Sequence, residues 1–402
     1  MKKILIIVLS FMGPLVNAQV NNTDSTTNEP LNSANNIIQG NSSKNITVGT
    51  YAQIDYNQQV SSVARYNGKL DVHRLVMFLG YKFSDRTHFV TEIEYEHVTE
   101  VYVEQAFLNY RINTAFNLRA GLLLIPMGII NEYHEPTTFN GVERPNLDGQ
   151  IVPSTWREMG IGFSGNFPNM SLKYQAYIVN GFDGYSEGVG TLRGQDALRK
   201  GRQKAAKSYM SSPNLSMKVD YYGLTGLKLG LAGYFGNSQS ELFNGIRHDD
   251  DLALAQADSS VINISMLGFD ARYQHNGFQA RGQVIRANIS NTSAYNEFTG
   301  QDLGAGLFGY YVEAGYDVFR LMNFKTDKKL VAFARYEKYD THDRVSSEQI
   351  KETAYDRTDI TTGLGFWLSN GAVLKADYQM FKNEDEESND KHQINLGVGI
   401  WF

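Results

Sequence analysis

Strict alternation of apolar and polar residues at the C-terminal end constrains the fold of this chain more than any other feature. Ile394, Leu396, Val398, Ile400 and Phe402 fall on one face of a strand, and the residues between them fall on the other. One face is therefore suited to an apolar phase and the other to water. An unpaired apolar edge strand would promote aggregation, whereas a closed barrel pairs its last strand with its first. The ending predicts a β-barrel that spans a membrane.

The N-terminal end predicts export and divides the chain into three parts. A basic start, an apolar run and a small-residue cleavage site at Val16-Asn17-Ala18 are typical of a signal peptide over residues 1–18. Residues 19–45 are rich in Asn, Ser and Thr, so we expect a flexible periplasmic segment. No later segment has the roughly 18 consecutive apolar residues of a transmembrane helix. Any membrane domain must therefore consist of strands, over residues 46–402.

The composition agrees with an all-β fold. The 24 Tyr, 22 Phe and 37 Gly residues, against 8 Pro, favour strands and tight turns. The mean hydropathy of −0.36 is low for a membrane protein. A barrel alternates lipid-facing and lumen-facing residues, however, so its average hydropathy is diluted in this way.

Period-two segments between turn residues predict about sixteen antiparallel strands in one barrel. Short turns and long links alternate between these segments, as expected for short periplasmic turns and long extracellular loops. The predicted strands cover residues 46–58, 69–83, 87–98, 101–112, 115–127, 157–166, 170–181, 214–222, 226–236, 261–274, 278–289, 307–319, 329–339, 358–368, 372–381 and 392–402.

Strand alternation assigns many charged side chains to the lumen. Glu92, Glu94 and Glu96 share one face of the third predicted strand, opposite outward Phe89 and Ile93. The other lining residues that we predict on the strands are Arg74, Arg111, Arg119, Arg281 and Arg335. Because charges of both signs cannot form an apolar core, we expect water to fill the middle of the barrel.

The third long link, near residues 130–156, is the most distinctive segment. It contains three prolines and several charges, so it is more rigid than an ordinary surface loop. We expect it to fold inward and narrow the channel; the alternative is an exterior loop packed on its neighbours or at a subunit contact. The residues that we place at this constriction are Glu132, Glu135, Arg144, Asp148 and Arg157.

Three stretches of this region resemble a known family: "RAGLLLIPMG" from Arg119, "HEPTTFNGVERP" from His134 and "IVPSTWREMGIGFSG" from Ile151. They are similar to the signature of the phosphate-selective porins of the O and P type. The resemblance is most specific over residues 100–184 and weaker over the rest of the barrel. It implies a homotrimer of sixteen-stranded channels in a Gram-negative outer membrane. It also implies that inward Arg and Lys side chains guide an anion past a narrow loop.

The charge balance leaves the selectivity open. The net charge is −6, and loss of Lys2 and Lys3 with the leader makes the mature chain more negative. An anion pore should have an excess of lumenal cations. We therefore expect passive diffusion of small hydrophilic or ionic solutes, with anions such as phosphate as one option. The alternative is a structural or adhesive barrel with a closed lumen and partner-binding loops.

A basic stretch in the fourth long link favours anions. Placed outside the membrane, it would gather anionic solutes or bind lipopolysaccharide phosphates; the alternative is a solvated loop or a short surface helix over residues 197–207. The basic residues are Arg193, Arg199, Lys200, Arg202, Lys204 and Lys207.

Neither an enzyme nor a metal protein is indicated. The chain has no cysteine, its eight histidines lack metal-ligand spacing, and no serine accompanies His97, which we expect on the outer face. We therefore expect no catalytic residues, metal or cofactor, and no nucleic-acid partner. The expected partners are membrane lipid, lipopolysaccharide, solutes and the barrel assembly machinery, reached through the strand ending in Phe402.

Overall fold

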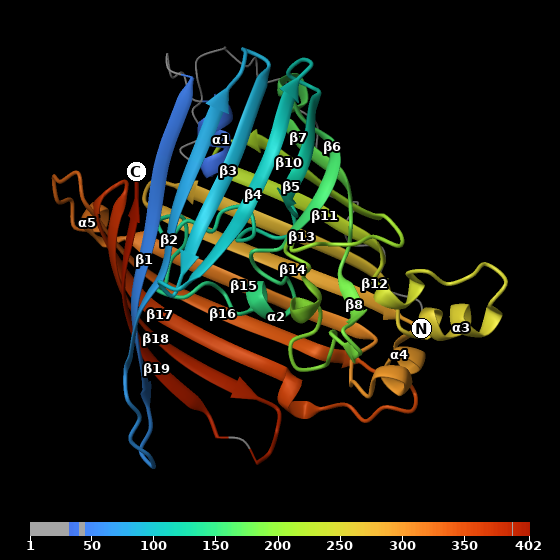
Figure 1. Ribbon diagram of the computed structural model, residues 1–402. Coiled ribbons are helices and arrows are strands. Elements are labelled where there is room, and N and C mark those ends of the chain that lie inside the picture. Colours follow the sequence, from blue (N-terminus) through green and yellow to red (C-terminus); the bar gives the residue numbers. More distant parts are fainter. Residues whose placement is uncertain (1–31, 40–44, 388) are drawn as a thin grey trace, which may run out of the picture.

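Sixteen strands of the described chain form one closed antiparallel barrel (Figure 1). The structure is a computed structural model that describes residues 32–39, 45–387 and 389–402; the predicted signal peptide lies outside them. The barrel strands are β1 (Ile46–Val60), β2 (Lys69–Lys82), β3 (Thr87–Glu96), β4 (Glu100–Arg111), β5 (Asn117–Leu124), β6 (Arg157–Phe167), β7 (Leu172–Val179), β10 (Asn214–Leu224), β11 (Leu227–Asn237), β13 (Asn263–His275), β14 (Phe278–Ser290), β15 (Gly306–Asp317), β16 (Lys329–Arg344), β17 (Asp356–Ser369), β18 (Ala372–Asn383) and β19 (Lys391–Trp401). The predicted fold class is confirmed.

Short elements lie in the connections. The strands β8 (Asp183–Ser186), β9 (Val189–Gly190) and β12 (Gln239–Ser240) form a small sheet outside the barrel. The helices are α1 (Ser33–Gln39), α2 (Leu147–Gln150), α3 (Asp251–Ser259), α4 (Thr292–Thr299) and α5 (Val318–Leu321), with 3-10 turns at Pro168–Met170, Arg199–Gly201, Glu241–Phe243 and Thr353–Tyr355. No helix of the described residues has the length and apolar character required to cross a membrane.

The terminal strand closes the barrel as its alternation predicts. β19 pairs with β1 in an antiparallel register, with Tyr51 opposite Trp401 and Val60 opposite His392. Leu396 is 49% exposed on the outer face, whereas Asn395 is fully buried on the inner face. No edge remains between the first and last strands of the barrel.

The long connections gather at one end of the barrel and the tight turns at the other. Two residues join β13 to β14 and two join β17 to β18, whereas β7 and β10 are separated by residues 180–213. Figure 1 shows α3 and α4 at the long-loop end and α5 at the opposite end. Since barrel strands alternate in direction, successive links must alternate between the two ends.

The N-terminal helix α1 lies inside the barrel (Figure 1). Residues 19–45 were expected to be a flexible segment, but part of that range is an ordered helix. Ala34 and Ile37 are one helical turn apart, and both are buried in the apolar cluster. The Asn32 side chain accepts a hydrogen bond from the Asn35 backbone N–H at 2.9 Å, as a helix cap does. This short apolar face explains why the helix packs against the wall.

Candidate functional site

The connection between β5 and β6, residues 125–156, lies inside the barrel and is here called the third loop (Figure 1). We expected water to fill the middle of the barrel. The loop occupies part of it instead, because its apolar side chains bury one another and pack on apolar wall residues. The loop residues that are at most 1% exposed include Ile125, Met127, Ile129, Ile130, Phe139, Val142, Leu147, Ile151, Val152 and Trp156.

One asparagine joins the two ends of the third loop. The Asn131 side-chain amide donates to the carbonyl oxygens of Ile125 and Trp156, both at 2.8 Å. Its side-chain oxygen accepts from the Trp156 backbone N–H at 2.8 Å. Asn131 is 1% exposed, so these bonds replace water at buried backbone groups. The loop therefore leaves and re-enters the wall at a fixed point.

Charged side chains of the wall bind the backbone of the third loop. Glu337 accepts a hydrogen bond from the Leu147 N–H at 3.0 Å, and Asp377 accepts one from the Val142 N–H at 2.6 Å. Two wall lysines donate hydrogen bonds to carbonyl oxygens of the loop: Lys218 to Gly128 at 2.7 Å and Lys375 to Phe139 at 2.8 Å. Each charged bond is stronger than a neutral one. Much of the inward charge that alternation predicts therefore fixes the loop.

Two inward glycines of β19 let the third loop approach the wall. A Cβ atom at Gly397 would lie 2.8 Å from Cγ1 of Val142. One at Gly399 would lie 3.0 Å from Cβ of Pro136. Both distances are shorter than ordinary carbon contacts. The polar face of the terminal strand therefore accommodates the loop as well as facing the lumen.

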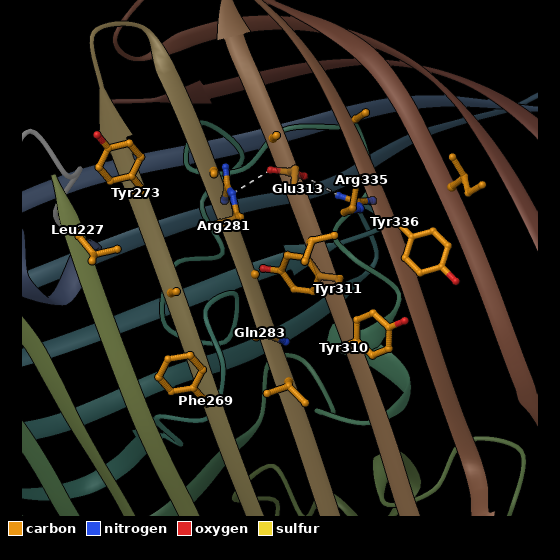
Figure 2. A pocket seen from close by; sticks show the side chains of 18 residues that line it. Leu227, Phe269, Tyr273, Arg281, Gln283, Tyr310, Tyr311, Glu313, Arg335 and Tyr336 are labelled. Atoms are coloured by element: carbon orange, nitrogen blue, oxygen red, sulfur yellow. Dashed lines mark hydrogen bonds and ion pairs between the residues drawn. The ribbon is translucent and has the colours of Figure 1, made fainter. Parts of the chain in front are cut away.

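Two of the predicted lining arginines form a chain of ion pairs along β14, β15 and β16 (Figure 2). Arg281 pairs with Glu313 at 2.8 Å, and Arg335 pairs with Glu313 at 3.3 Å and with Glu337 at 2.9 Å. Arg335 was expected to face the passage but is 1% exposed, because it lies beneath the third loop. On the opposite face of the same strands, Tyr310 and Tyr336 border a shallow hollow of about 770 Å³ (Figure 2).

The acidic row of β3 points inward as predicted but is mostly covered. Glu92 is fully buried and Glu94 is 3% exposed, whereas Glu96 is only partly buried. The Ser33 hydroxyl of α1 donates to Glu92, and its backbone N–H donates to Glu135 at 2.8 Å. The helix α1 therefore docks on acidic groups of both the wall and the third loop.

Glu104 completes this cluster and was missed by the sequence analysis. Alternation assigns it to the outer face of β4, but the register shifts here: Glu92 pairs with Gln105 and Ile93 with Val103. The extra residue is a β-bulge, and the bulge turns Glu104 inward. It contacts His134 Nε2 at 3.2 Å and the Tyr51 hydroxyl at 2.9 Å. A carboxylate at a predicted lipid-facing position is the signal that would have revealed the bulge.

The charge of His134 is set by these neighbours. Burial lowers the pKa of His134, but the charge and the hydrogen bond of Glu104 outweigh it, and the pKa rises to about 10. Burial also raises the pKa of Glu135 in the same loop. A protonated imidazole therefore ties the third loop to the carboxylates of the wall.

A cavity of about 730 Å³, here called the vestibule, lies between α1, the third loop and the inner wall. Its lining extends to the tight turns at Asp85 and Thr114 and to Asn166 near the end of β6. The basic lining residues are Lys82, Arg111, Arg119, Lys173 and Lys228, and the acidic ones are Asp85, Glu132 and Asp220. Cations therefore outnumber anions in this cavity, although the chain as a whole is acidic.

Neutral groups hold the predicted lining residue Arg119 at the vestibule. It donates to the Asn109 side chain and to the Tyr177 hydroxyl, both at 3.1 Å. Arg111 is exposed on the neighbouring strand β4. Of the arginines predicted to line the pore or the constriction, Arg111 and Arg119 are the two that line the vestibule.

The other predicted constriction residues are spread over the loop and the wall. Glu132 lines the vestibule, and Glu135 accepts a hydrogen bond from α1. Arg144 and Asp148 bind other groups and do not line the vestibule. Burial raises the pKa of Asp148 to about 7. The contacts are Glu132 with Lys218 at 3.1 Å, Arg144 with the His134 carbonyl at 3.4 Å, Asp148 with the Gln283 amide at 2.9 Å, Arg74 with Glu94 at 3.7 Å and Arg157 over the Tyr102 ring at 5.6 Å.

The basic stretch of the fourth long link splits into two groups. Arg193 pairs with Asp196 at 2.8 Å, and Arg202 donates to the Ser154 carbonyl of the third loop. Arg199 also donates to the third loop, to the Gly149 carbonyl at 3.4 Å. The Lys204 ammonium lies over the Tyr102 ring. Lys200 and Lys207 are exposed. Of the alternative, a solvated loop or a short surface helix over residues 197–207, the only helical part is the 3-10 turn at Arg199–Gly201.

Comparison with known proteins identifies one relative and several similar folds. No family model matches the chain. An uncharacterized protein of Aquifex aeolicus is 30% identical over 368 residues, which cover 86% of this chain and 78% of the relative.

Among solved structures, the anion-selective porin of Comamonas acidovorans has a TM-score of 0.56 at 12% identity, covering 89% of this chain and 99% of that one. The outer membrane channel DcaP of Acinetobacter baumannii has 0.57 at 10%, covering 89% and 97%. A trimer form of OmpT, an outer membrane protein of Vibrio cholerae, has 0.52 at 11%, covering 89% and 100%. The chain thus has the porin fold, and it belongs to one family with the Aquifex aeolicus protein.

Proposed function

We propose that this protein is an outer-membrane porin of a Gram-negative bacterium. Small hydrophilic or ionic solutes diffuse passively through the barrel, past the third loop. The vestibule carries the proposal: it is a charged cavity inside a closed wall whose outer face is apolar. The likeness in fold to solved porins supports it.

The basic lining of the vestibule supports a preference for anions such as phosphate. A charged cavity with low-dielectric walls concentrates counter-ions of the opposite sign. Exposed Lys200 and Lys207 would add to this at the other end, by attracting anionic solutes or lipopolysaccharide phosphates. The resemblance to phosphate-selective porins points the same way, and we include a homotrimer in the proposal on that basis.

The reversal potential in a salt gradient tests the proposal. Purified protein in a planar bilayer should pass discrete currents with an anion preference, and Arg111→Glu with Arg119→Glu should shift it toward cations. Arg320→Glu is the control for each of these two changes, because it makes the same charge reversal at one position on the exposed face of α5, outside the vestibule. A wild-type preference for cations would overturn the anion part alone. Absence of current from inserted protein would overturn the channel.

A second candidate is a structural or adhesive barrel with a closed lumen. The packing of both α1 and the third loop inside the wall favours it. Under this alternative, inserted protein passes no current, while its loops still bind a partner in pull-down experiments.

A further inference from the structure

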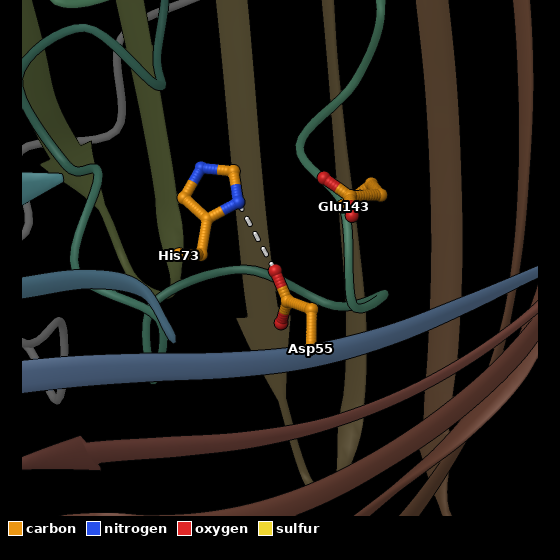
Figure 3. Close-up of side chains that lie close together, drawn as sticks. All are labelled: Asp55, His73 and Glu143. Carbon is orange, nitrogen blue, oxygen red and sulfur yellow. Dashed lines mark ion pairs between the residues drawn. The ribbon is translucent and has the colours of Figure 1, made fainter. Parts of the chain in front are cut away.

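Three side chains from separate segments converge inside the barrel (Figure 3). Asp55 lies on β1, His73 on β2 and Glu143 on the third loop. Their ligand atoms all lie within 4.8 Å of one another, and His73 Nδ1 is 3.1 Å from Asp55 Oδ2. Ligand atoms around a four-coordinate zinc ion are about 3.3 Å apart, given bonds of about 2.0 Å. Shifts of side chains alone would bring the group to that spacing.

A β-bulge places His73 in this group. The pairing passes from Gln53 opposite Arg74 to Asp55 opposite Asp71, so β2 contains one residue more than β1 here. Arg74 is 3% exposed and His73 is partly buried, whereas Val72 and Leu75 face outward. Two successive residues therefore face the lumen, as a bulge allows. Strict alternation would turn either His73 or Arg74 toward lipid.

His97, which was expected on the outer face, also lies here. It pairs with Asp71, and its ring centroid is 5.6 Å from that of His73. His97 is the first residue of the tight link between β3 and β4, and its backbone φ of 51° departs from the extended backbone on which strand alternation depends.

The group has little compensating positive charge. Asp55 is 2% exposed, and its Oδ1 is buried with no hydrogen-bond partner among the described residues. Neutral amides hold the other oxygens: Gln53 donates to Asp55 Oδ2 at 3.0 Å, and Asn57 donates to Glu143 Oε1 at 3.0 Å. The neighbouring Lys375 is directed to the Phe139 carbonyl. A buried and a partly buried carboxylate therefore share one imidazole, which is costly without a further cation.

We propose that Asp55, His73 and Glu143 bind a divalent transition-metal ion, with zinc as the representative. One imidazole nitrogen and two carboxylate oxygens form a donor set that zinc accepts, and water completes the coordination. The amides of Gln53 and Asn57 orient the carboxylates, as outer groups do in metal sites. The His73 side chain is 25% exposed, so the ion has access from the lumen.

The ion would clamp the third loop to the first two strands, because Glu143 comes from the loop and the other ligands from the wall. This role differs from that of the cluster of Glu92, Glu104 and His134. Those side chains are fully buried, and Tyr51 and Ser33 already bond to them.

Zinc titration of the full chain in detergent tests the site independently of conductance. After treatment with a chelator, calorimetry with zinc chloride should give one ion per chain. His73→Ala and Glu143→Gln should each weaken binding more than about tenfold. His392→Ala on β19, opposite Val60, and Glu348→Gln on an exposed loop are matched controls outside the proposed ligand set, and they should bind zinc as the wild type does.

Heat-modifiability on gels should show that all variants remain folded barrels. Absence of a stoichiometric site in the wild type would overturn the proposal. So would equal affinity in folded His73→Ala and Glu143→Gln, since the ion would then lie elsewhere. Neither result bears on the channel, which is tested by current.

Discussion

Replacing Asn131 with alanine should release both ends of the third loop. The change removes three buried hydrogen bonds of 2.8 Å each, two donated by the side chain and one accepted by it. At about 1 kcal/mol for each bond, the free energy of unfolding should fall by about 3 kcal/mol. Asn131→Asp keeps the acceptor for the Trp156 N–H but loses both donors, so it should be destabilised as well.

Urea unfolding in detergent micelles measures this change through tryptophan fluorescence, because Trp156 is buried beside Asn131. Limited proteolysis within residues 125–156 gives a second readout of a loosened loop. Asn244→Ala is the control, since that side chain is exposed in the link between β11 and β13. A loss below about 0.5 kcal/mol, with the loop still protected from protease, would refute the assigned role of Asn131.

Three further predictions concern the loop and the helix inside the barrel. The pKa of His134 is raised to about 10, so its contribution to stability is complete below its ordinary value of 6.5 and is lost as the pH rises through about 10; His134→Gln should flatten this part of the pH–stability curve. Ile37→Asp puts a carboxylate into the apolar contact of α1, so the helix should leave the wall and the single-channel conductance should change, whereas Ile37→Val keeps the contact apolar and should conduct as the wild type does. Gly399→Leu should displace the third loop from β19, because even a Cβ would lie 3.0 Å from Pro136; increased cleavage of the loop by protease would reveal it, and unchanged protection would contradict the packing.

The strands could be predicted from the sequence because one face of each meets an apolar phase. This makes residues such as Leu396 and Asn395 alternate strictly, and the periodicity survives along the whole barrel. The alternation fails where the backbone departs from it. Glu104 and His73 lie at bulges, whose position depends on the pairing with the next strand. Sequence spacing alone contains no such information.

The interior was predicted less completely than the wall. The stretch with Phe139, Val142 and Leu147 was recognised as distinctive, but its apolar residues find their partners only once the barrel encloses them. The same applies to α1, in which Ala34 and Ile37 form too short a pattern to predict a helix. Wall charges such as Arg335 were placed on the correct face, yet which of them a loop would cover depended on the tertiary fold.

Site-directed modification during current recording tests whether the conducting path runs through the vestibule. The chain contains no cysteine, so Asn117→Cys places a single thiol in the vestibule lining. We predict discrete single-channel currents that fall when a bulky methanethiosulfonate reagent reacts with this thiol, and no change in the cysteine-free wild type. Unchanged current after complete modification, verified by mass spectrometry, would contradict a conducting path through the vestibule.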